Sequence, residues 1–160
     1  MKIGIAADHG GFALKEILRP YLTKLGYEVT DFGNTQQDDS DDYPDFVGPL
    51  AKAIVAGDVE RGIAICGSGV GASVAANKIR GVRAALINDS FSAHQGVEDD
   101  DLNLLCLGGR ITGYMVAQEY VLAFLNAQYT GLKRHARRLN KVAQFTNNAS
   151  CVVIRTACQG

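Results

Sequence analysis

Residues 62–73 read GIAICGSGVGAS, an apolar run that ends in Cys66 and passes into a loop with alternating glycines. A short apolar run bounded by glycine is typical of a buried strand. The small residues after Gly71 favour a helix that starts directly from the loop. The stretch therefore predicts a strand, a glycine loop and a helix in immediate succession. This is the order found in α/β folds built on a parallel sheet.

The alternation of strand and helix extends in both directions along the chain. Apolar residues at helical spacing run from Phe12 to Leu25, and Gly26 is placed to end that helix. This spacing predicts a five-stranded parallel sheet with helices on both faces. We expect strands over residues 2–7, 27–33, 61–66, 81–89 and 102–109, helices over 12–25, 46–56, 71–79 and 112–128, and a loop or short helix over 91–101.

The composition is ordinary for a soluble globular protein. The chain has 160 residues, of which 47% are hydrophobic and 21% charged, and its formal net charge is −1. This length fits one domain, and the charge gives no reason to expect nucleic acid or a membrane as partner. The sequence shows neither an apolar run of the roughly 20 residues that a membrane span needs nor a signal peptide. We expect a cytoplasmic protein.

The cysteines are scattered along the chain, with no paired spacing. This distribution predicts reduced thiols and no metal site, because disulfide frameworks and zinc sites need clustered cysteines. No motif surrounds Cys106, Cys151 or Cys158, and we expect them to serve packing.

Residues with chemical potential gather where the predicted strands end. Asp8 and His9 follow the first strand, and Cys66 closes the third directly before the 67–71 loop. Because ligands of open parallel sheets sit beyond the carboxyl ends of the strands, we expect these residues to share one site.

Two interpretations of the glycine loop remain open. Its backbone N–H groups, at the start of a helix, could cradle an anion. The glycines could instead serve a tight turn that requires positive φ. The loop has neither the GK[ST] ending of a nucleotide-binding P-loop nor the GxGxxG spacing of a dinucleotide site.

The side chains beside the loop carry similar alternatives. A helix N-terminus would lower the pKa of the Cys66 thiol and favour the thiolate, although a cysteine in an apolar run is often plain core. Ser68 could donate to an oxyanion or simply form the turn. Asp8 and His9 could bind hydroxyls and move protons, or be a helix cap and a surface histidine.

A basic segment follows Gly131. Arg134 and Arg138 are four residues apart, so on a helix they would share a face and could grip one phosphate. A solvated charge run is the alternative explanation.

Taken together, the segments ADHGG, DYPD, CGSGVGASVAANKIRGVRAAL and LNLLCLGGR resemble the ribose-5-phosphate isomerase B family, which includes the galactose-6-phosphate isomerase subunits. The resemblance spans residues 2–142. It implies a Rossmann-like three-layer α/β/α fold, no metal and no cofactor. It also implies a homodimer or homotetramer, with active sites built across a subunit interface.

The resemblance implies roles for individual residues. Cys66 would be the base that moves a proton between C1 and C2 of a sugar phosphate through a cis-enediolate, and the loop would stabilise the enediolate oxygens. Ser68, His9 and Asp99 would be the other catalytic residues. The implied substrate contacts are Asp8, His9, Tyr43, Gly67, Ser68, Gly69, Val70, Gly71, Asp100, Arg110, Arg134 and Arg138.

One segment departs from the family pattern. Where the family commonly has HNN or HND, with a histidine that opens the sugar ring, this chain has Asp99 and Asp100 within EDDD. Crowding by other acids could raise the pKa of Asp99 and let it act instead. A substrate that needs no ring opening, such as a tetrose 4-phosphate, is a second explanation, and His94 supplying the imidazole is a third.

The sequence thus predicts an aldose–ketose isomerase of ribose 5-phosphate and ribulose 5-phosphate. The alternatives are another sugar (a hexose 6-phosphate, a tetrose 4-phosphate or a free rare sugar) and a non-catalytic sugar-phosphate binding subunit. Retention of Cys66 argues against the last, because binding alone needs no base. We expect residues 1–142 to form the isomerase domain and residues 143–160 a tail for packing or oligomer contacts. Apolar residues on most faces of the 112–128 helix predict contact with another chain.

Overall fold

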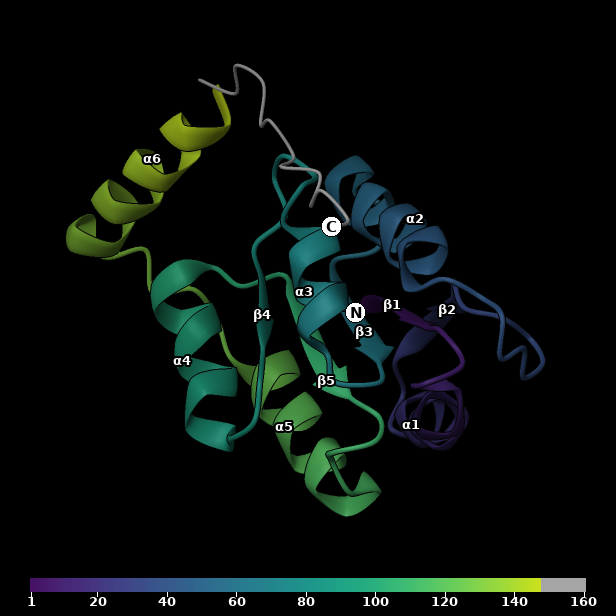
Figure 1. Ribbon diagram of the computed structural model, residues 1–160. Coiled ribbons are helices and arrows are strands. Elements are labelled where there is room, and N and C mark those ends of the chain that lie inside the picture. The colour runs from purple at the N-terminus through teal and green to yellow at the C-terminus, as the bar shows by residue number, and fades with distance from the viewer. Residues whose placement is uncertain (148–160) are drawn as a thin grey trace, which may run out of the picture.

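Five parallel strands form one sheet between two layers of helices in the computed structural model, which describes residues 1–147 (Figure 1). The strands are β1 (Lys2–Ala7), β2 (Glu28–Asp31), β3 (Arg61–Cys66), β4 (Ala84–Leu86) and β5 (Leu104–Gly108). The helices are α1 (Phe12–Lys24), α2 (Tyr43–Ala56), α3 (Val70–Ala76), α4 (Ser90–Asp100), α5 (Tyr114–Asn126) and α6 (Lys133–Asn147). The predicted α/β/α architecture is confirmed.

The strand order is β2-β1-β3-β5-β4. The chain passes from β1 outward to β2 and then returns to place β3 on the other side of β1, with Ile5 opposite Ile63. The strand order therefore reverses between β1 and β3. In open parallel sheets the crevice for a ligand lies at such a reversal, beyond the carboxyl ends of the two strands.

The two faces of the sheet carry separate cores. Apolar side chains of α1, α4 and α5 cover one face, and those of α2 and α3 cover the other (Figure 1). The central strands are buried on both sides, which explains why β3 and β5 are continuous apolar runs rather than alternating ones.

Several element boundaries differ from the sequence-based expectation. Helix α2 begins at Tyr43 instead of residue 46, because Pro44 is well suited to the first turn of a helix. Of the two alternatives for residues 91–101, a loop or a short helix, the structure has the helix, over Ser90–Asp100, and the Asp89 side chain caps it by accepting the Ser92 N–H at 2.7 Å. As expected, Gly26 follows α1 with φ of +90°.

Helix α6 extends away from the body of the molecule and touches mainly α4 (Figure 1). It continues the chain helically past residue 142, through Asn147. The rest of the predicted tail, with Cys151 and Cys158, lies outside the described residues. Among residues 1–147, no helix combines the length and apolar character needed to cross a membrane.

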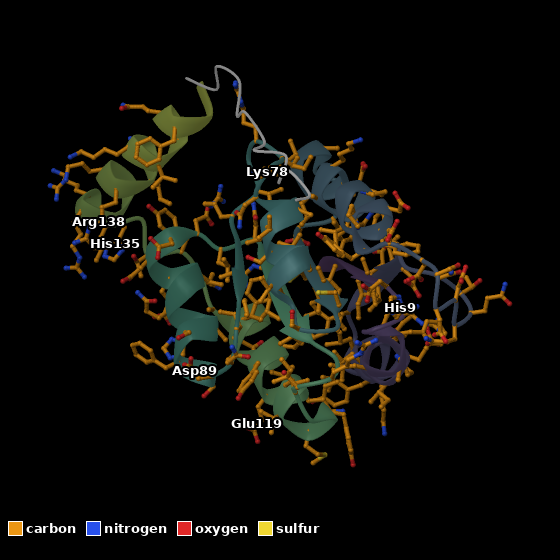
Figure 2. All side chains as sticks on the ribbon, in the orientation of Figure 1. His9, Lys78, Asp89, Glu119, His135 and Arg138 are labelled. Atoms are coloured by element: carbon orange, nitrogen blue, oxygen red, sulfur yellow. The ribbon has the colours of Figure 1, made fainter. Side chains whose placement is uncertain are left out.

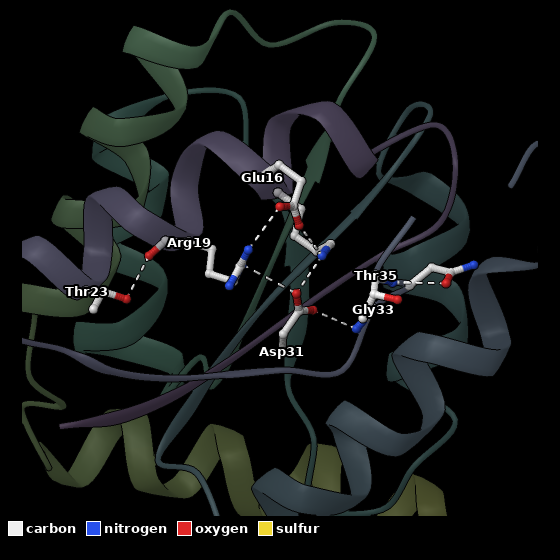
Figure 3. A network of polar contacts seen from close by, with 8 residues as sticks. Glu16, Arg19, Thr23, Asp31, Gly33 and Thr35 are labelled. Carbon is white, nitrogen blue, oxygen red and sulfur yellow. Dashed lines mark hydrogen bonds and ion pairs between the residues drawn. The ribbon is translucent and has the colours of Figure 1, made fainter. Parts of the chain in front are cut away.

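A buried charge ties α1 to strand β2 at the edge of the sheet (Figure 3). The side chain of Lys15 is fully buried, and its Nζ lies 2.5 Å from Asp31 Oδ2 and 2.6 Å from Glu16 Oε1. Arg19 joins both carboxylates from the solvent side. The second oxygen of Asp31 accepts the Gly33 N–H at 2.8 Å, so the network also fixes the chain as it leaves β2.

Replacing Asp31 by Asn should lower the free energy of unfolding by about 1–3 kcal/mol, because the buried ammonium loses one of its two carboxylate partners. Lys15→Met should cost less, since it removes the buried charge and keeps an apolar side chain of similar length. Urea unfolding measures both. The control is Glu28→Gln, at an exposed position of β2, expected within about 0.5 kcal/mol of the parent. An Asp31→Asn protein as stable as the parent would mean that Glu16 alone compensates Lys15.

Candidate active site

A pocket of about 480 Å³ opens beyond the carboxyl ends of β1 and β3, where the strand order reverses. Its lining comes from the turn after β1, the glycine loop after β3, the turn after β5 and the start of α2. The lining residues are Asp8, His9, Tyr43, Cys66, Gly67, Ser68, Gly71, Arg110 and Ile111.

Cys66 lies at the base of this pocket. Only 4% of the residue is exposed, and its Sγ accepts the Gly69 N–H at 3.1 Å. Gly69 has φ of +80°, and a Cβ there would lie 2.8 Å from the Leu107 carbonyl carbon. The turn explanation for the loop therefore holds at Gly69, and the same turn aims an N–H donor at the sulfur. By contrast, Cys106 is fully buried in the core, and that burial raises the pKa of its thiol.

Three turns meet with almost no space between their backbones. A Cβ on Gly10 would lie 2.7 Å from the Gly67 nitrogen. The Gly109 N–H donates to the Cys66 carbonyl at 2.8 Å, and the Arg110 N–H donates to Gly67 O at 3.1 Å. These bonds place Arg110 beside the glycine loop. Its side chain thereby becomes a cationic wall of the pocket.

Tyr43 closes the opposite side. It is the first residue of α2, and a Cβ on Gly71 would lie 2.8 Å from its ring. The third glycine of the loop is therefore needed for close packing against the tyrosine. The DYP segment and the glycine loop, far apart in sequence, form one surface.

Two effects oppose each other at the carboxyl group of Asp8. Only 6% of the residue is exposed, and this burial raises the pKa of Asp8. The Gly10 N–H, donating to Oδ1 at 2.9 Å, acts against the shift. Asp8 thus holds the turn after β1 in place while it lines the pocket.

His9 is held by a residue from a distant loop. Its Nδ1 lies 2.9 Å from Asp41 Oδ1, and its backbone N–H donates to the same oxygen at 2.8 Å. The hydrogen bond to Asp41 raises the pKa of His9 above its ordinary value. With Nδ1–H donating to the carboxylate of Asp41, Nε2 is the nitrogen left for a ligand in the pocket.

A second polar cluster forms where α6 meets the end of α4. Asp99 accepts a hydrogen bond from Gln95 Nε2 at 2.8 Å, and its other oxygen lies 3.1 Å from Nδ1 of His135. His135 is 1% exposed, and its Nε2 accepts from Arg134 Nε at 2.7 Å. Because an arginine can only donate, the ring proton of His135 lies on Nδ1.

The two clusters lie at opposite ends of the strands: the cysteine pocket at their carboxyl ends and the Asp99 cluster at their amino ends. Helix α4 runs back against the strands, so its end lies beside the beginnings of β4 and β5, where Asp101 binds Arg83. Figure 2 shows His135 and Arg138 on one side of the molecule and His9 on the other. Within one chain, the cysteine pocket and the basic helix do not meet.

Comparisons with known proteins agree with the fold. Residues 3–142 match the model of the Ribose/Galactose Isomerase family. The chain belongs to this family. A solved structure of ribose-5-phosphate isomerase B from Clostridium thermocellum is 45% identical, with a TM-score of 0.90, and the match covers 94% of this chain and 100% of that one.

Two curated relatives carry different substrate names. Ribose-5-phosphate isomerase B of Escherichia coli is 40% identical over 141 residues, 88% of this chain and 93% of the relative. D-erythrulose-4-phosphate isomerase of Pectobacterium atrosepticum is 36% identical over 131 residues, 82% of this chain and 86% of the relative. Membership of the family makes this chain an enzyme, an isomerase.

The site residues predicted from the sequence fall into two groups in the structure of this isomerase, one at the pocket and one away from it. The pocket brings together most of those at the strand ends. Two members of the glycine loop, the buried Gly69 and the exposed Val70, are not among its lining residues. Four predicted residues lie away from the pocket: Asp99, Asp100, Arg134 and Arg138. His94 contacts Glu98 and the Phe91 ring on α4 and is not among the lining residues.

Sequence reasoning missed two residues that hold the site residues in place. Asp41 belongs to a run of similar acidic residues, and no local pattern distinguishes it from its neighbours. His135 lies in a basic segment and looks solvated from sequence, yet it is buried between Asp99 and Arg134. Both contacts join segments more than 30 residues apart, so only the fold reveals them.

An NMR titration of the His9 ring should give a pKa above 6.5, and Asp41→Asn should lower it, because the amide carries no charge. The stabilisation that the pair gives the folded state is complete below pH 6.5 and is lost as the pH rises through the folded-state pKa. Asp42→Asn, at an exposed neighbouring position, is the control. Equal pKa values in the parent and Asp41→Asn would show that the pair does not form in solution.

Proposed function

We propose that this isomerase interconverts ribose 5-phosphate and ribulose 5-phosphate, with Cys66 as the base. The observation that carries the proposal is the position of the Cys66 sulfur, which lines the pocket and accepts the Gly69 N–H. The family relationship supports a sugar phosphate as substrate. The relatives from Escherichia coli and Clostridium thermocellum, named ribose-5-phosphate isomerase B, support the pentose.

The proposed chemistry needs one proton to move between adjacent carbons. The Cys66 thiolate takes the proton from C2 of the open-chain aldose, the C1 oxygen gains negative charge, and a cis-enediolate forms. The same thiol then returns a proton to C1. Backbone N–H donors of the glycine loop and the Ser68 hydroxyl, beside the sulfur, would stabilise the developing oxyanion.

We infer that the phosphate is bound by a second copy of the chain. Arg134 and Arg138 lie on the opposite side of the molecule from the cysteine pocket. One chain therefore cannot bring both Cys66 and these two arginines to the same substrate. A homodimer with shared sites would bring the basic α6 of one copy to the cysteine pocket of the other. Asp99 and Asp100 would then enter the same pocket from the partner. We place this activity in the cytoplasm.

A tetrose 4-phosphate is the second candidate substrate. The relative from Pectobacterium atrosepticum is named D-erythrulose-4-phosphate isomerase, and such a sugar has no free hydroxyl to form a five- or six-membered ring. The aspartate at position 99, where the family commonly has a ring-opening histidine, is compatible with this substrate. A turnover comparison of four-, five- and six-carbon sugar phosphates separates the candidates.

Cys66→Ala should abolish the exchange of solvent deuterium into ribulose 5-phosphate at C1, because no other group would take that proton. Cys66→Ser should restore little, since a hydroxyl has a far higher pKa. Proton NMR in D₂O measures the exchange, and circular dichroism checks the fold. Cys106→Ala, a change of the same size in the core, is the matched control and should keep the activity. If Cys66→Ala turned over substrate at nearly the rate of the parent, another residue would have to be the base.

Arg138→Ala should raise the KM for ribose 5-phosphate while the control Arg137→Ala, an exposed neighbour on α6, changes little. Loss of one charge-assisted contact should cost about 1.5–3 kcal/mol in kcat/KM. Mixing Cys66→Ala and Arg138→Ala subunits should restore part of the activity, because half of the sites in a mixed dimer would contain neither change. Absence of restoration in a verified mixed dimer would contradict a shared site.

A further inference from the structure

His135 lies buried between an acidic and a basic side chain, where α6 meets the end of α4. Only 1% of the residue is exposed, whereas the basic side chains around it on α6 are exposed. Its Nδ1 lies 3.1 Å from both Oδ1 and the backbone carbonyl oxygen of Asp99. On the other side of the ring, Nε2 accepts the Arg134 Nε–H at 2.7 Å. Each ring nitrogen therefore has its own partner.

The contact with Arg134 defines which nitrogen of this histidine carries the proton. An arginine can only donate, so Nε2 presents its lone pair and the ring proton lies on Nδ1, toward Asp99. A doubly protonated ring would direct an N–H at the guanidinium and lose the bond. Asp99, which also accepts a hydrogen bond from Gln95 at 2.8 Å, thus selects the tautomer that the bond from Arg134 requires.

The bond between His135 and Arg134 does not attach α6 to the rest of the molecule, because both residues belong to α6. The contacts of His135 with Asp99 on α4 serve that attachment. The additional bond acts on the guanidinium instead. It holds Nε of Arg134, while the two terminal nitrogens have no hydrogen bond or ion pair among residues 1–147. The guanidinium is therefore oriented and still able to bind an anion.

Orientation before binding matters for an arginine that grips phosphate. A long exposed side chain loses rotamer freedom when it binds, and a side chain that is already held loses less. The planar guanidinium also forms paired hydrogen bonds with phosphate only when it faces the group correctly. Arg138, one turn further along α6 (Figure 2), has no hydrogen bond or ion pair with another side chain in the described part of the chain. Of the two arginines, the fold orients Arg134.

We propose that His135 is a positioning residue for the phosphate group of the substrate: in the tautomer that Asp99 selects, it holds Arg134 ready to bind that phosphate. The inference rests on the proposed function, in which Arg134 and Arg138 of one copy reach the cysteine pocket of the other. His135 itself does not touch the substrate. Asp99 takes part in the same chain of contacts, which runs from α4 through the imidazole to the guanidinium.

Two polar substitutions separate the orientation of Arg134 from the attachment of α6 to α4. His135→Gln places its amide near the position of Nε2, so its oxygen can still accept from Arg134. His135→Asn places its amide near the position of Nδ1, so its nitrogen can still donate to Asp99. Titration calorimetry of the full chain with inorganic phosphate gives a Kd, steady-state kinetics on ribose 5-phosphate give KM and kcat, and urea unfolding gives the stability.

His135→Asn should raise the Kd of phosphate and the KM of ribose 5-phosphate by about three- to tenfold, with a smaller change in kcat. His135→Gln should keep the Kd within about twofold of the parent, although it loses more stability than His135→Asn. In an Arg134→Ala background, His135→Asn should change the Kd by less than about twofold, because the residue through which it acts is absent. Arg137→Ala, at an exposed neighbouring position, is the control and should match the parent.

Two results would overturn the proposal and reduce His135 to a structural link. One is a phosphate Kd that follows stability, with His135→Gln weaker than His135→Asn. The other is an equal effect of His135→Asn with and without Arg134. If Arg134→Ala and Arg138→Ala both left the Kd unchanged, the phosphate site on α6 would be wrong and the inference with it. A parent that binds phosphate through Arg134 but does not turn over ribose 5-phosphate would contradict the proposed substrate, while the Kd values would still decide the role of His135.

Discussion

The close approach of three backbone turns at the carboxyl edge of the sheet is the constraint on which the rest of the structure depends. A Cβ on Gly10 would lie 2.7 Å from the Gly67 nitrogen, and one on Gly109 would lie 2.5 Å from the Gly10 carbonyl oxygen. Backbone hydrogen bonds from Gly109 and Arg110 hold the turns together at this distance. Any side chain there would separate the ends of β1, β3 and β5 and displace Cys66.

The direction of the chain in a parallel sheet explains why the functional residues fall into two groups. All five strands end on the side of the sheet where the pocket lies. The connecting helices run in the opposite direction and end on the side where the strands begin. Cys66 belongs to a strand end, whereas Asp99 belongs to the end of α4. A single chain of this topology cannot bring these positions together, so an activity that uses both requires a second copy. The exposed apolar residues in the turn before α5 and in its first turn (Ile111, Tyr114, Met115 and Val116) are compatible with such a contact.

Buried charge pairs recur at the connections of this fold. Lys15 joins α1 to β2, Asp41 joins the loop after β2 to His9, and His135 joins α6 to α4. Each pair links segments that are distant in sequence and fixes a side chain in one orientation. A buried ion pair adds little net stability, because desolvation opposes the attraction. Of the three pairs, the one between Asp41 and His9 lies at the pocket, where it orients the imidazole.

The amino-acid sequence alone determined the sheet, the helices and the location of Cys66 at a strand end, because hydrophobic periodicity and glycine placement are local signals. It also indicated the family through one continuous cysteine–glycine segment. Only the tertiary structure decided which acidic residue of the loop before α2 reaches His9, and that Asp99 and the basic helix lie far from the cysteine. These outcomes depend on contacts across 30 or more residues and on the direction of each connection. Contacts of this kind leave no pattern within a single stretch of sequence. In the loop before α2, for example, any of several neighbouring aspartates could have been the one that reaches His9.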